Sequence, residues 1–254
     1  MLKLTNLIRP ATLAEAYDLL RRPGHVAMAG CTLSQLEEMG GIGVELAPLL
    51  KSDITAEGQT IRIGAMTTLR SLEVCPLLAE GPLSILPSSV SHLLGPAFRN
   101  LATVGGSVGA RLPQSELLTA LLALDARVVL YGYGTISMEE WLADPELRDL
   151  ILEVELEREQ GATGFCAVRN SYTDTAMLCA AARKRDGKWR IAVGARPGGA
   201  LLFALPSDWE VPDIVASCAA RTPLEGNLLA SKAYREQICS AVIRRAMEEE
   251  RRCR

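Results

Sequence analysis

The sequence predicts an α+β fold in two regions, residues 1–160 and 161–254. Before residue 160, short apolar runs typical of strands alternate with stretches of helical periodicity. After Gln160 and Gly161 the pattern changes to a series of short strands, and the chain ends in one long helical stretch. This change of pattern places the predicted domain boundary near residue 160.

The first region is predicted to contain two lobes that divide near residue 53. The first lobe begins with a strand over residues 3–8. A helix follows over 12–22, where Thr12 can cap the helix and Glu15 stands three residues later. A buried strand over 25–28 then leads to a turn and a polar, helix-like piece over 34–39.

The second lobe is predicted to begin with a hairpin, because two strand patterns flank the turn residues Glu57, Gly58 and Gln59. Its other elements follow from apolar periodicity. The expected elements are strands at 54–56, 60–65, 127–131 and 150–156, and helices at 69–79, 83–94 and 115–124.

The second region is predicted to contain three short strands, over 164–169, 175–183 and 189–195. Residues 185–188, with Asp186 and Gly187 at the centre, fit the tip of a hairpin between the last two strands. The closing helix runs from 232 to about 251 and should pack on this region. Its predicted inner face consists of Tyr234, Ile238, Ala241 and Val242.

Composition excludes several classes of protein. The chain has 254 residues, 48% of them hydrophobic, and a formal net charge of −3, so it can bury a substantial core and offers no basic footprint for nucleic acid. Its seven cysteines are scattered and never spaced as C-x-x-C, which argues for reduced thiols and against a zinc or iron–sulfur site built from this chain alone. The start does not resemble a signal peptide, and no apolar run approaches the roughly 20 residues that span a bilayer, so we expect a cytoplasmic protein without a membrane segment.

One glycine-rich segment has the chemistry of a phosphate site: Thr103-Val104-Gly105-Gly106-Ser107. Adjacent glycines allow positive φ angles and add no side-chain bulk, so consecutive backbone N–H groups can point into one concavity and bind a phosphate. The hydroxyls of Thr103 and Ser107 would add donors. A tight structural turn without a ligand is the alternative, and it is the commoner outcome for an isolated pair of glycines.

A second turn of this kind, Ala29-Gly30-Cys31-Thr32, follows the buried strand over 25–28. A dinucleotide carries two adjacent phosphates, so two such turns form a better cradle than one. A Rossmann nucleotide site is excluded, because no G-x-G-x-x-G stands between a strand and a helix, and no G-x-x-x-x-G-K-S/T loop is present. A bound nucleotide would therefore be held by the two turns.

Further segments carry a resemblance to a known family. They read Ala29-Gly30-Cys31-Thr32, Ile63-Gly64-Ala65-Met66-Thr67-Thr68-Leu69, the run from Arg99 to Ala126, and Ala230-Ser231-Lys232-Ala233-Tyr234-Arg235. In this order they resemble the FAD-binding subunits of molybdenum hydroxylases, which include xanthine and carbon monoxide dehydrogenases. The run from Arg99 to Ala126 is the most specific of them, and the resemblance covers nearly the whole chain.

The resemblance implies a fold and a cofactor. The implied fold is α+β, with a two-lobed FAD-binding region of the vanillyl-alcohol-oxidase-like type and a C-terminal α+β domain that holds a three-stranded antiparallel sheet. The two turns would wrap the diphosphate of FAD, with Val104 near the ring system and Glu116 near the sugar-like portion. The implied cofactor-binding residues are Ala29, Gly30, Cys31, Thr32, Leu33, Thr103, Val104, Gly105, Gly106, Ser107 and Glu116.

The resemblance also implies a division of labour among subunits. A molybdenum-cofactor subunit would hydroxylate the substrate, an iron–sulfur subunit would relay the electrons, and FAD on this chain would pass them to NAD⁺. The flavin itself supplies the redox chemistry, so no side chain of this protein needs to be an acid, a base or a nucleophile.

Three departures from the family pattern motivate an alternative function. Cys31 replaces the second glycine of the first turn, Leu33 replaces a polar residue, and Glu116 replaces an aspartate. If the turn needs a positive φ at position 31, Cys31 costs on the order of 1 kcal/mol. The alternative is a non-catalytic assembly or scaffold subunit that has lost FAD. A stand-alone flavin oxidase is disfavoured, because the sequence contains no substrate domain.

Overall fold

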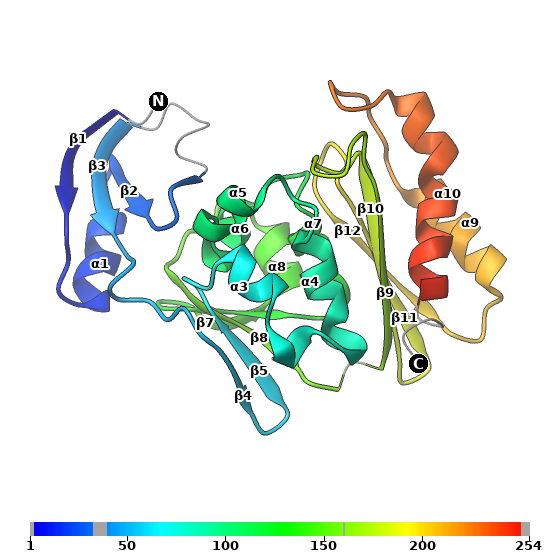
Figure 1. Ribbon diagram of the computed structural model, residues 1–254, viewed down its shortest axis with the longest axis horizontal. Coiled ribbons are helices and arrows are strands. Elements are labelled where there is room, and N and C mark those ends of the chain that lie inside the picture. The colour runs from blue at the N-terminus through cyan, green and yellow to red at the C-terminus, as the bar shows by residue number, and fades with distance from the viewer. Residues whose placement is uncertain (1–2, 33–39, 160, 250–254) are drawn as a thin grey trace.

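The computed structural model describes residues 3–32, 40–159 and 161–249, and in these residues the chain forms three sheets covered by helices (Figure 1). The sheets follow one another along the chain, over residues 3–45, 54–157 and 162–206. The predicted α+β class is confirmed. The breaks expected near residues 53 and 160 fall between sheets, and the division into domains stays a prediction.

The first sheet is parallel, with strand order β1-β3-β2, and lies at the end of the molecule that carries the N-terminus (Figure 1). Thr12 caps the helix as predicted, because its side chain accepts a hydrogen bond from the Glu15 N–H. Strand β3 was not predicted, since three of its first four residues are glycines, which are depleted in strands. The helix-like piece expected over 34–39 lies outside the described residues. The elements are β1 (Lys3–Ile8), α1 (Leu13–Leu20), β2 (His25–Met28) and β3 (Gly40–Glu45).

The second sheet has strand order β4-β5-β8-β6-β7, and all its neighbouring strands are antiparallel. The predicted hairpin is present, with Gly58 in the left-handed region at φ 60°. The expected helices over 69–79 and 83–94 are shorter than predicted, because 3-10 turns that contain Pro76 and Pro82 replace parts of them. The strands are β4 (Ile54–Glu57), β5 (Thr60–Gly64), β6 (Arg127–Leu130), β7 (Gly134–Ser137) and β8 (Ile151–Glu157).

The helices of this middle part of the chain pack against the second sheet (Figure 1). The last of them, α8, is fixed by a capping box in which Ser137 and Glu140 bond each other's backbone N–H groups. The helices are α3 (Leu69–Glu73), α4 (Ile85–Val90), α5 (Pro96–Leu101), α6 (Val104–Ala110), α7 (Glu116–Ala123) and α8 (Met138–Ala143).

The third sheet is antiparallel, with order β12-β11-β10-β9, so the expected number of three strands is wrong by one in the described chain. The additional strand is β12, an apolar run that follows Gly198 and Gly199. The predicted hairpin tip joins β10 to β11, with positive φ at both Asp186 and Gly187. The elements are β9 (Ala162–Val168), β10 (Leu178–Arg185), β11 (Lys188–Gly194), β12 (Leu201–Pro206), α9 (Val211–Arg221) and α10 (Lys232–Glu249).

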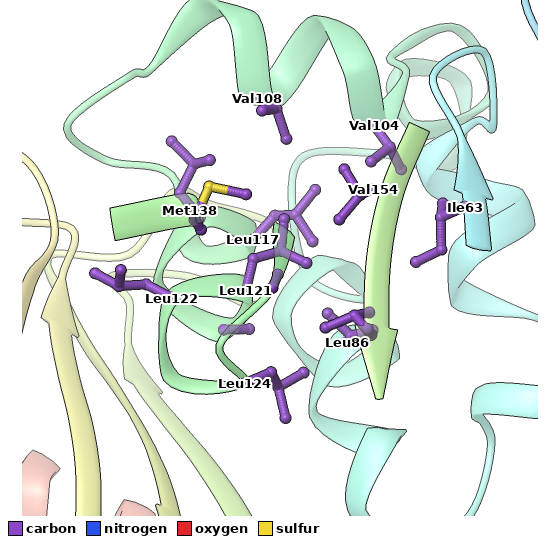
Figure 2. Close-up of a cluster of buried hydrophobic side chains, with 14 of the residues drawn as sticks. Ile63, Leu86, Val104, Val108, Leu117, Leu121, Leu122, Leu124, Met138 and Val154 are labelled. Atoms are coloured by element: carbon purple, nitrogen blue, oxygen red, sulfur yellow. The ribbon is translucent and has the colours of Figure 1, made fainter. Parts of the chain in front are cut away.

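Helix α7 lies at the centre of the molecule, and all eight of its residues are buried. Its apolar side chains point into a cluster that also receives Val104, Val108 and Val154 (Figure 2). On its other side α7 packs against β10 and β11, where small residues permit a close approach. A Cβ built on Gly194 would lie only 1.8 Å from Thr119 Oγ1. The third sheet is thus packed directly against the middle of the chain.

Helix α10 covers the other face of the third sheet, as predicted, but through a different set of side chains. Tyr234 is 39% exposed and Ala241 is exposed, so the predicted inner face is wrong in part. The neighbouring Arg235 lies on the inner face instead, where it is fully buried and donates to the carbonyl oxygens of Met177, Glu225 and Ala230. The inner face is thus shifted by one residue from the predicted one. The buried side chains are Arg235, Cys239, Val242, Ile243, Ala246 and Met247.

Candidate functional site

The two glycine-bearing turns lie against each other. Gly30 follows β2, and a Cβ built on it would lie 1.8 Å from the carbonyl oxygen of Leu101 and 3.2 Å from Thr103 Cγ2. A Cβ contact below 3 Å requires the backbone to shift, so only glycine fits at position 30 in this arrangement. The turn 29–32 and the segment before α6 therefore share one surface, although they are far apart in the sequence.

The first turn contains the backbone strain that the sequence suggested. Cys31 adopts φ 56°, in the left-handed region that favours glycine. Its thiol donates to the carbonyl oxygen of Ala29 at 3.1 Å. The N–H groups of Gly30 and Thr32 have no hydrogen-bond partner among residues 3–32, 40–159 and 161–249. As far as the described residues go, these two amides can therefore donate to a ligand. Leu33 lies outside the described residues.

The second turn is the first turn of helix α6 and has a different geometry from the one predicted. Neither Gly105 nor Gly106 has a positive φ. The N–H of Val104 donates to Thr67 O at 2.8 Å, and that of Gly105 donates to Ala65 O at 2.8 Å. The prediction that consecutive amides of this segment are free for a phosphate is therefore wrong.

The other two amides of the segment, those of Gly106 and Ser107, donate to Thr103, the N-cap residue of α6. Thr103 Oγ1 accepts from the Gly106 N–H at 3.1 Å, and Thr103 O accepts from the Ser107 N–H at 2.9 Å. The Ser107 hydroxyl also donates to Thr103 O, at 2.9 Å. Gly106 is exposed and Ser107 is half-buried, so both lie at the surface of the turn.

The two glycines of α6 serve close packing. A Cβ on Gly105 would lie 2.7 Å from the Cβ of Ala65, and a Cβ on Gly106 would lie 2.9 Å from Thr103 Oγ1. The partner of Gly105 belongs to the segment 63–69, which sequence analysis treated only as support for the family resemblance. This segment lies next to α6 and supports the second turn, because Ala65 and Thr67 accept hydrogen bonds from its amides.

A short antiparallel contact completes this support. Thr68 and Thr103 form an isolated β-bridge, and the Leu69 N–H donates to Ala102 O at 2.8 Å. Thr67 is fully buried and its hydroxyl donates to Asp53 O at 3.2 Å. The second turn is thus attached to the second sheet by several backbone hydrogen bonds, and this attachment fixes the surface against which Gly30 lies.

Two other predicted site residues have buried side chains. Val104 is 0% exposed and points into the core, away from the surface of the turn (Figure 2). Glu116 is 1% exposed at the start of α7, and its carboxylate pairs with the guanidinium of Arg169 and accepts from the Ala176 N–H at 3.2 Å. Burial raises the pKa of Glu116 to about 7, although Arg169 acts in the opposite direction.

The position of Glu116 joins two parts of the chain. Its carboxylate belongs to α7, whereas Arg169 and Ala176 lie beside strands β9 and β10 of the third sheet. The predicted contact between Glu116 and a cofactor stays a prediction.

Other candidate sites are less well formed. A cavity of about 590 Å³ is lined by Gln59, Pro82, Arg158, Glu159 and Gly161, none of which belongs to either turn. In the described residues no group of three or more His, Cys, Asp and Glu side chains is placed to bind a metal. None of the helices in the described part of the chain is both long and apolar enough to span a bilayer.

Comparison with known proteins places the sequence in a family. Residues 3–156 match the family described as FAD binding domain in molybdopterin dehydrogenase. The chain is 31% identical over 140 residues to the nicotinate dehydrogenase FAD-subunit of Eubacterium barkeri, which covers 51% of this chain and 47% of that protein. It is 30% identical over 149 residues to the uncharacterized protein YgfM of Escherichia coli K12, which covers 55% and 54%. The chain thus spans about half the length of the curated relatives that it matches.

Solved structures show the same fold over nearly the whole chain. A chain of the Cu,Mo-CO dehydrogenase in its cyanide-inactivated form superposes with a TM-score of 0.86 at 20% identity and covers 100% of both chains. A chain of quinoline 2-oxidoreductase from Pseudomonas putida 86 gives a TM-score of 0.80 at 22% identity, over 98% of this chain and 97% of the other. Because the family match spans residues 3–156 of 254, this chain belongs to the family of FAD-binding domains in molybdopterin dehydrogenases.

Proposed function

We propose that this chain is the FAD-carrying subunit of a molybdenum hydroxylase and holds the diphosphate of FAD between the turn 29–32 and the turn 103–107. The observation that carries the proposal is the contact of Gly30 with Leu101, which brings the two turns to one surface. Two adjacent phosphates need donors and a surface that they can approach closely, and in this arrangement the first turn supplies the donors and the second turn the surface.

The residues present fit this role mainly through the first turn. The N–H groups of Gly30 and Thr32 have no partner in the described chain, and the Thr32 hydroxyl is a further donor. Gly106 adds an exposed backbone surface without a side chain, so a diphosphate can approach it closely. In this arrangement the first turn donates hydrogen bonds to the phosphates, and the diphosphate lies against the fixed backbone of the second turn.

The protein's part in the reaction is to bind and orient the cofactor. FAD, when bound, supplies the redox chemistry that accepts and passes on electrons. The hydrogen bonds that the N–H groups of α6 donate to Thr67, Ala65 and Thr103 fix the second turn. The contact of Gly30 with Leu101 fixes the distance between the turns. Placing the cofactor on such supported backbone holds it at a constant position relative to its electron partners.

The partners in this proposal are a molybdenum-cofactor subunit and an iron–sulfur subunit, with NAD⁺ as the electron acceptor. The support for partner subunits is the naming of the relatives. One is called an FAD-subunit, and another, from Paenarthrobacter nicotinovorans, is called the alpha subunit of a 6-hydroxypseudooxynicotine dehydrogenase complex. The support for NAD⁺ is the resemblance to xanthine dehydrogenases alone.

Purification of the native complex tests these proposals separately. We expect a yellow particle that releases FAD on denaturation and contains molybdenum and iron in addition to this chain. Reduction of NAD⁺ by the particle, measured at 340 nm with a hydroxylation substrate, tests the acceptor. A yellow particle without molybdenum would contradict the proposed partners, whereas a molybdenum-containing particle without FAD would contradict the proposed role of this chain.

A scaffold subunit that has lost FAD is the second candidate. The observation that favours it is the left-handed backbone of Cys31, a position that glycine would occupy without strain. This candidate predicts that the purified chain is colourless and takes up no added FAD. Absorbance near the flavin bands after incubation with FAD and removal of free FAD separates the two functions.

A further inference from the structure

The N-terminal lobe, defined here as the described residues up to 45, is joined to the rest of the protein less extensively than the third sheet is. Helix α7 packs broadly against β10 and β11, and Gly194 fits closely over Thr119. The lobe has a small core of its own, formed by Ala16, Leu19 and Val44, and the buried residues that join this core from outside the lobe are Leu46 and Leu150. In Figure 1 the lobe lies at one end of the molecule.

The chain leaves the lobe through one short connection. After β3, residues 46–50 lead to Lys51, whose carbonyl oxygen accepts from the Met66 N–H at 2.8 Å. The carbonyl oxygen of Asp53 accepts from the Gly64 N–H at 3.0 Å. Residues from Lys51 onward are therefore attached to the second sheet, whereas the Leu46 N–H donates to Met28 O of the lobe at 2.9 Å, so the lobe and the sheet are connected through 46–50.

Besides the packing on Leu150, two close contacts between described residues hold the lobe in place, and each depends on a glycine. One is Gly30 against Leu101, at the proposed cofactor site. The other is made by Tyr17 of α1, whose hydroxyl oxygen would lie 2.3 Å from a Cβ built on Gly132. The rings of Tyr17 and Tyr131 also contact each other, with centroids 5.0 Å apart and planes tilted by 48°.

The surface that receives Tyr17 is held rigidly. Asp149 accepts hydrogen bonds from the N–H groups of Gly132, at 3.0 Å, and Tyr133, at 2.8 Å. These bonds fix the connection between β6 and β7 so that Gly132 presents its bare Cα to the Tyr17 hydroxyl. A lobe that is fixed at Gly30, at Tyr17 and at its connection cannot rotate freely.

We propose that Tyr17 is a positioning residue: its contact with Tyr131 and Gly132 seats the N-terminal lobe and so sets the distance between the two glycine-bearing turns. The part of this inference that concerns cofactor affinity rests on the proposed function. Tyr17 does not belong to either turn. It acts through Gly30 and Thr32, because a lobe released at Tyr17 swings about 46–50 and moves their amides away from the second turn.

The test combines hydrogen exchange without cofactor and equilibrium titration with FAD, on the full chain. The variants are Tyr17→Ala, Tyr17→Phe, which keeps the ring, and Gly132→Val, which fills the receiving surface. Tyr133→Ala is the matched control, because Tyr133 is 64% exposed and close by in sequence. We expect Tyr17→Ala and Gly132→Val to speed exchange in peptides covering 46–50 and 25–31, and to weaken FAD binding by about threefold to tenfold. Tyr133→Ala should resemble the unmodified protein. Tyr17→Phe keeps the contact with the Tyr131 ring but loses the hydroxyl next to Gly132, so its effect should lie between those of Tyr17→Ala and the unmodified protein.

The hydrogen-exchange arm and the FAD-titration arm of the test give results that can be told apart. Unchanged exchange at 46–50 in Tyr17→Ala would overturn the seating of the lobe by Tyr17, whether or not FAD binds. Faster exchange with unchanged FAD affinity would overturn the effect of seating on the turns and would leave the proposed function intact. If the unmodified protein bound no FAD, the proposed function would fail, and the exchange arm would still decide the seating of the lobe.

Discussion

Gly30 lies so close to Leu101 that a methyl group on Gly30 would be 1.8 Å from the Leu101 carbonyl oxygen. This contact joins the N-terminal lobe to the start of α6 at the proposed cofactor site. We predict that Gly30→Ala forces the two turns apart and lowers the free energy of unfolding by about 1–3 kcal/mol. Chemical denaturation measures the loss of stability, and an FAD titration should show affinity reduced by at least roughly tenfold.

Gly109→Ala is a matched control for that substitution. Gly109 lies on α6, and a Cβ there would be 3.5 Å from Ile151 Cδ1, which is an ordinary contact. Alanine favours the helix by about 0.5–1 kcal/mol over glycine, so this variant should be as stable as the unmodified protein or more stable. Equal stability of Gly30→Ala and Gly109→Ala would show that the first turn does not need glycine.

The left-handed backbone of Cys31 predicts a stabilising substitution. Its φ of 56° is unfavourable for a residue with a Cβ and free of strain for glycine. Cys31→Gly should raise the free energy of unfolding by up to about 1 kcal/mol. Cys31→Ala removes the thiol but keeps the Cβ, so it should not stabilise the protein. A melting temperature that rises in both variants would assign the effect to the thiol instead of the backbone.

Glu116 predicts a pH dependence of stability. Burial raises its pKa from 4.5 to about 7, so the folded protein binds a proton there more tightly than the unfolded chain does. The stability that this proton contributes is complete below about pH 4.5 and is lost as the pH rises through about 7. The loss amounts to roughly 3 kcal/mol at most, at 1.36 kcal/mol for each unit.

Glu116→Gln tests this dependence by its slope. Denaturation curves at several pH values between about 4.5 and 7 should show a shallower decline in the variant than in the unmodified protein. Glu139→Gln is the control, because the side chain of Glu139 is 62% exposed. A variant with an unchanged slope would mean that Glu116 is not the group that binds the proton.

The close packing of α7 on the third sheet predicts that the effects of substitutions at Gly194 and Thr119 on stability are coupled. Gly194→Ala would place a Cβ 1.8 Å from Thr119 Oγ1, which is fully buried, and should cost about 1–3 kcal/mol. Thr119→Ala removes that oxygen, so the double variant should regain part of the loss. A double-mutant cycle by chemical denaturation measures the coupling, and strictly additive effects would contradict the close fit.

The elements that the sequence predicts correctly depend on local signals. Thr12 caps α1, Gly58 turns the first hairpin, and Asp186 and Gly187 turn the last one. Each of these residues acts on its own few neighbours, so the pattern along the chain is sufficient to predict the element.

The elements that the sequence does not predict depend on contacts between distant residues. Strand β3 is rich in glycine and becomes a strand by pairing with β1 and β2 on both sides. The inner face of α10 includes Arg235, whose hydrogen-bond partners Met177 and Glu225 lie outside the helix. Hydrophobic periodicity contains no information on these contacts.

The candidate site shows the same division between local and distant signals. The sequence identified both turns, and position 31 has the positive φ that the missing glycine suggested. It did not show that Thr67 and Ala65 accept the hydrogen bonds of the Val104 and Gly105 amides. That error arose because a glycine pair can serve either a ligand or close packing, and only the approach to Ala65 shows that packing applies here.

A crystal structure of the protein with bound FAD is the most direct test of the central claim, that contacting turns hold the cofactor's diphosphate. We predict phosphate oxygens within about 3 Å of the Gly30 and Thr32 amide nitrogens, a normal hydrogen-bond distance, and next to Gly106. A diphosphate bound elsewhere on the chain, or turns separated from each other in the complex, would contradict it.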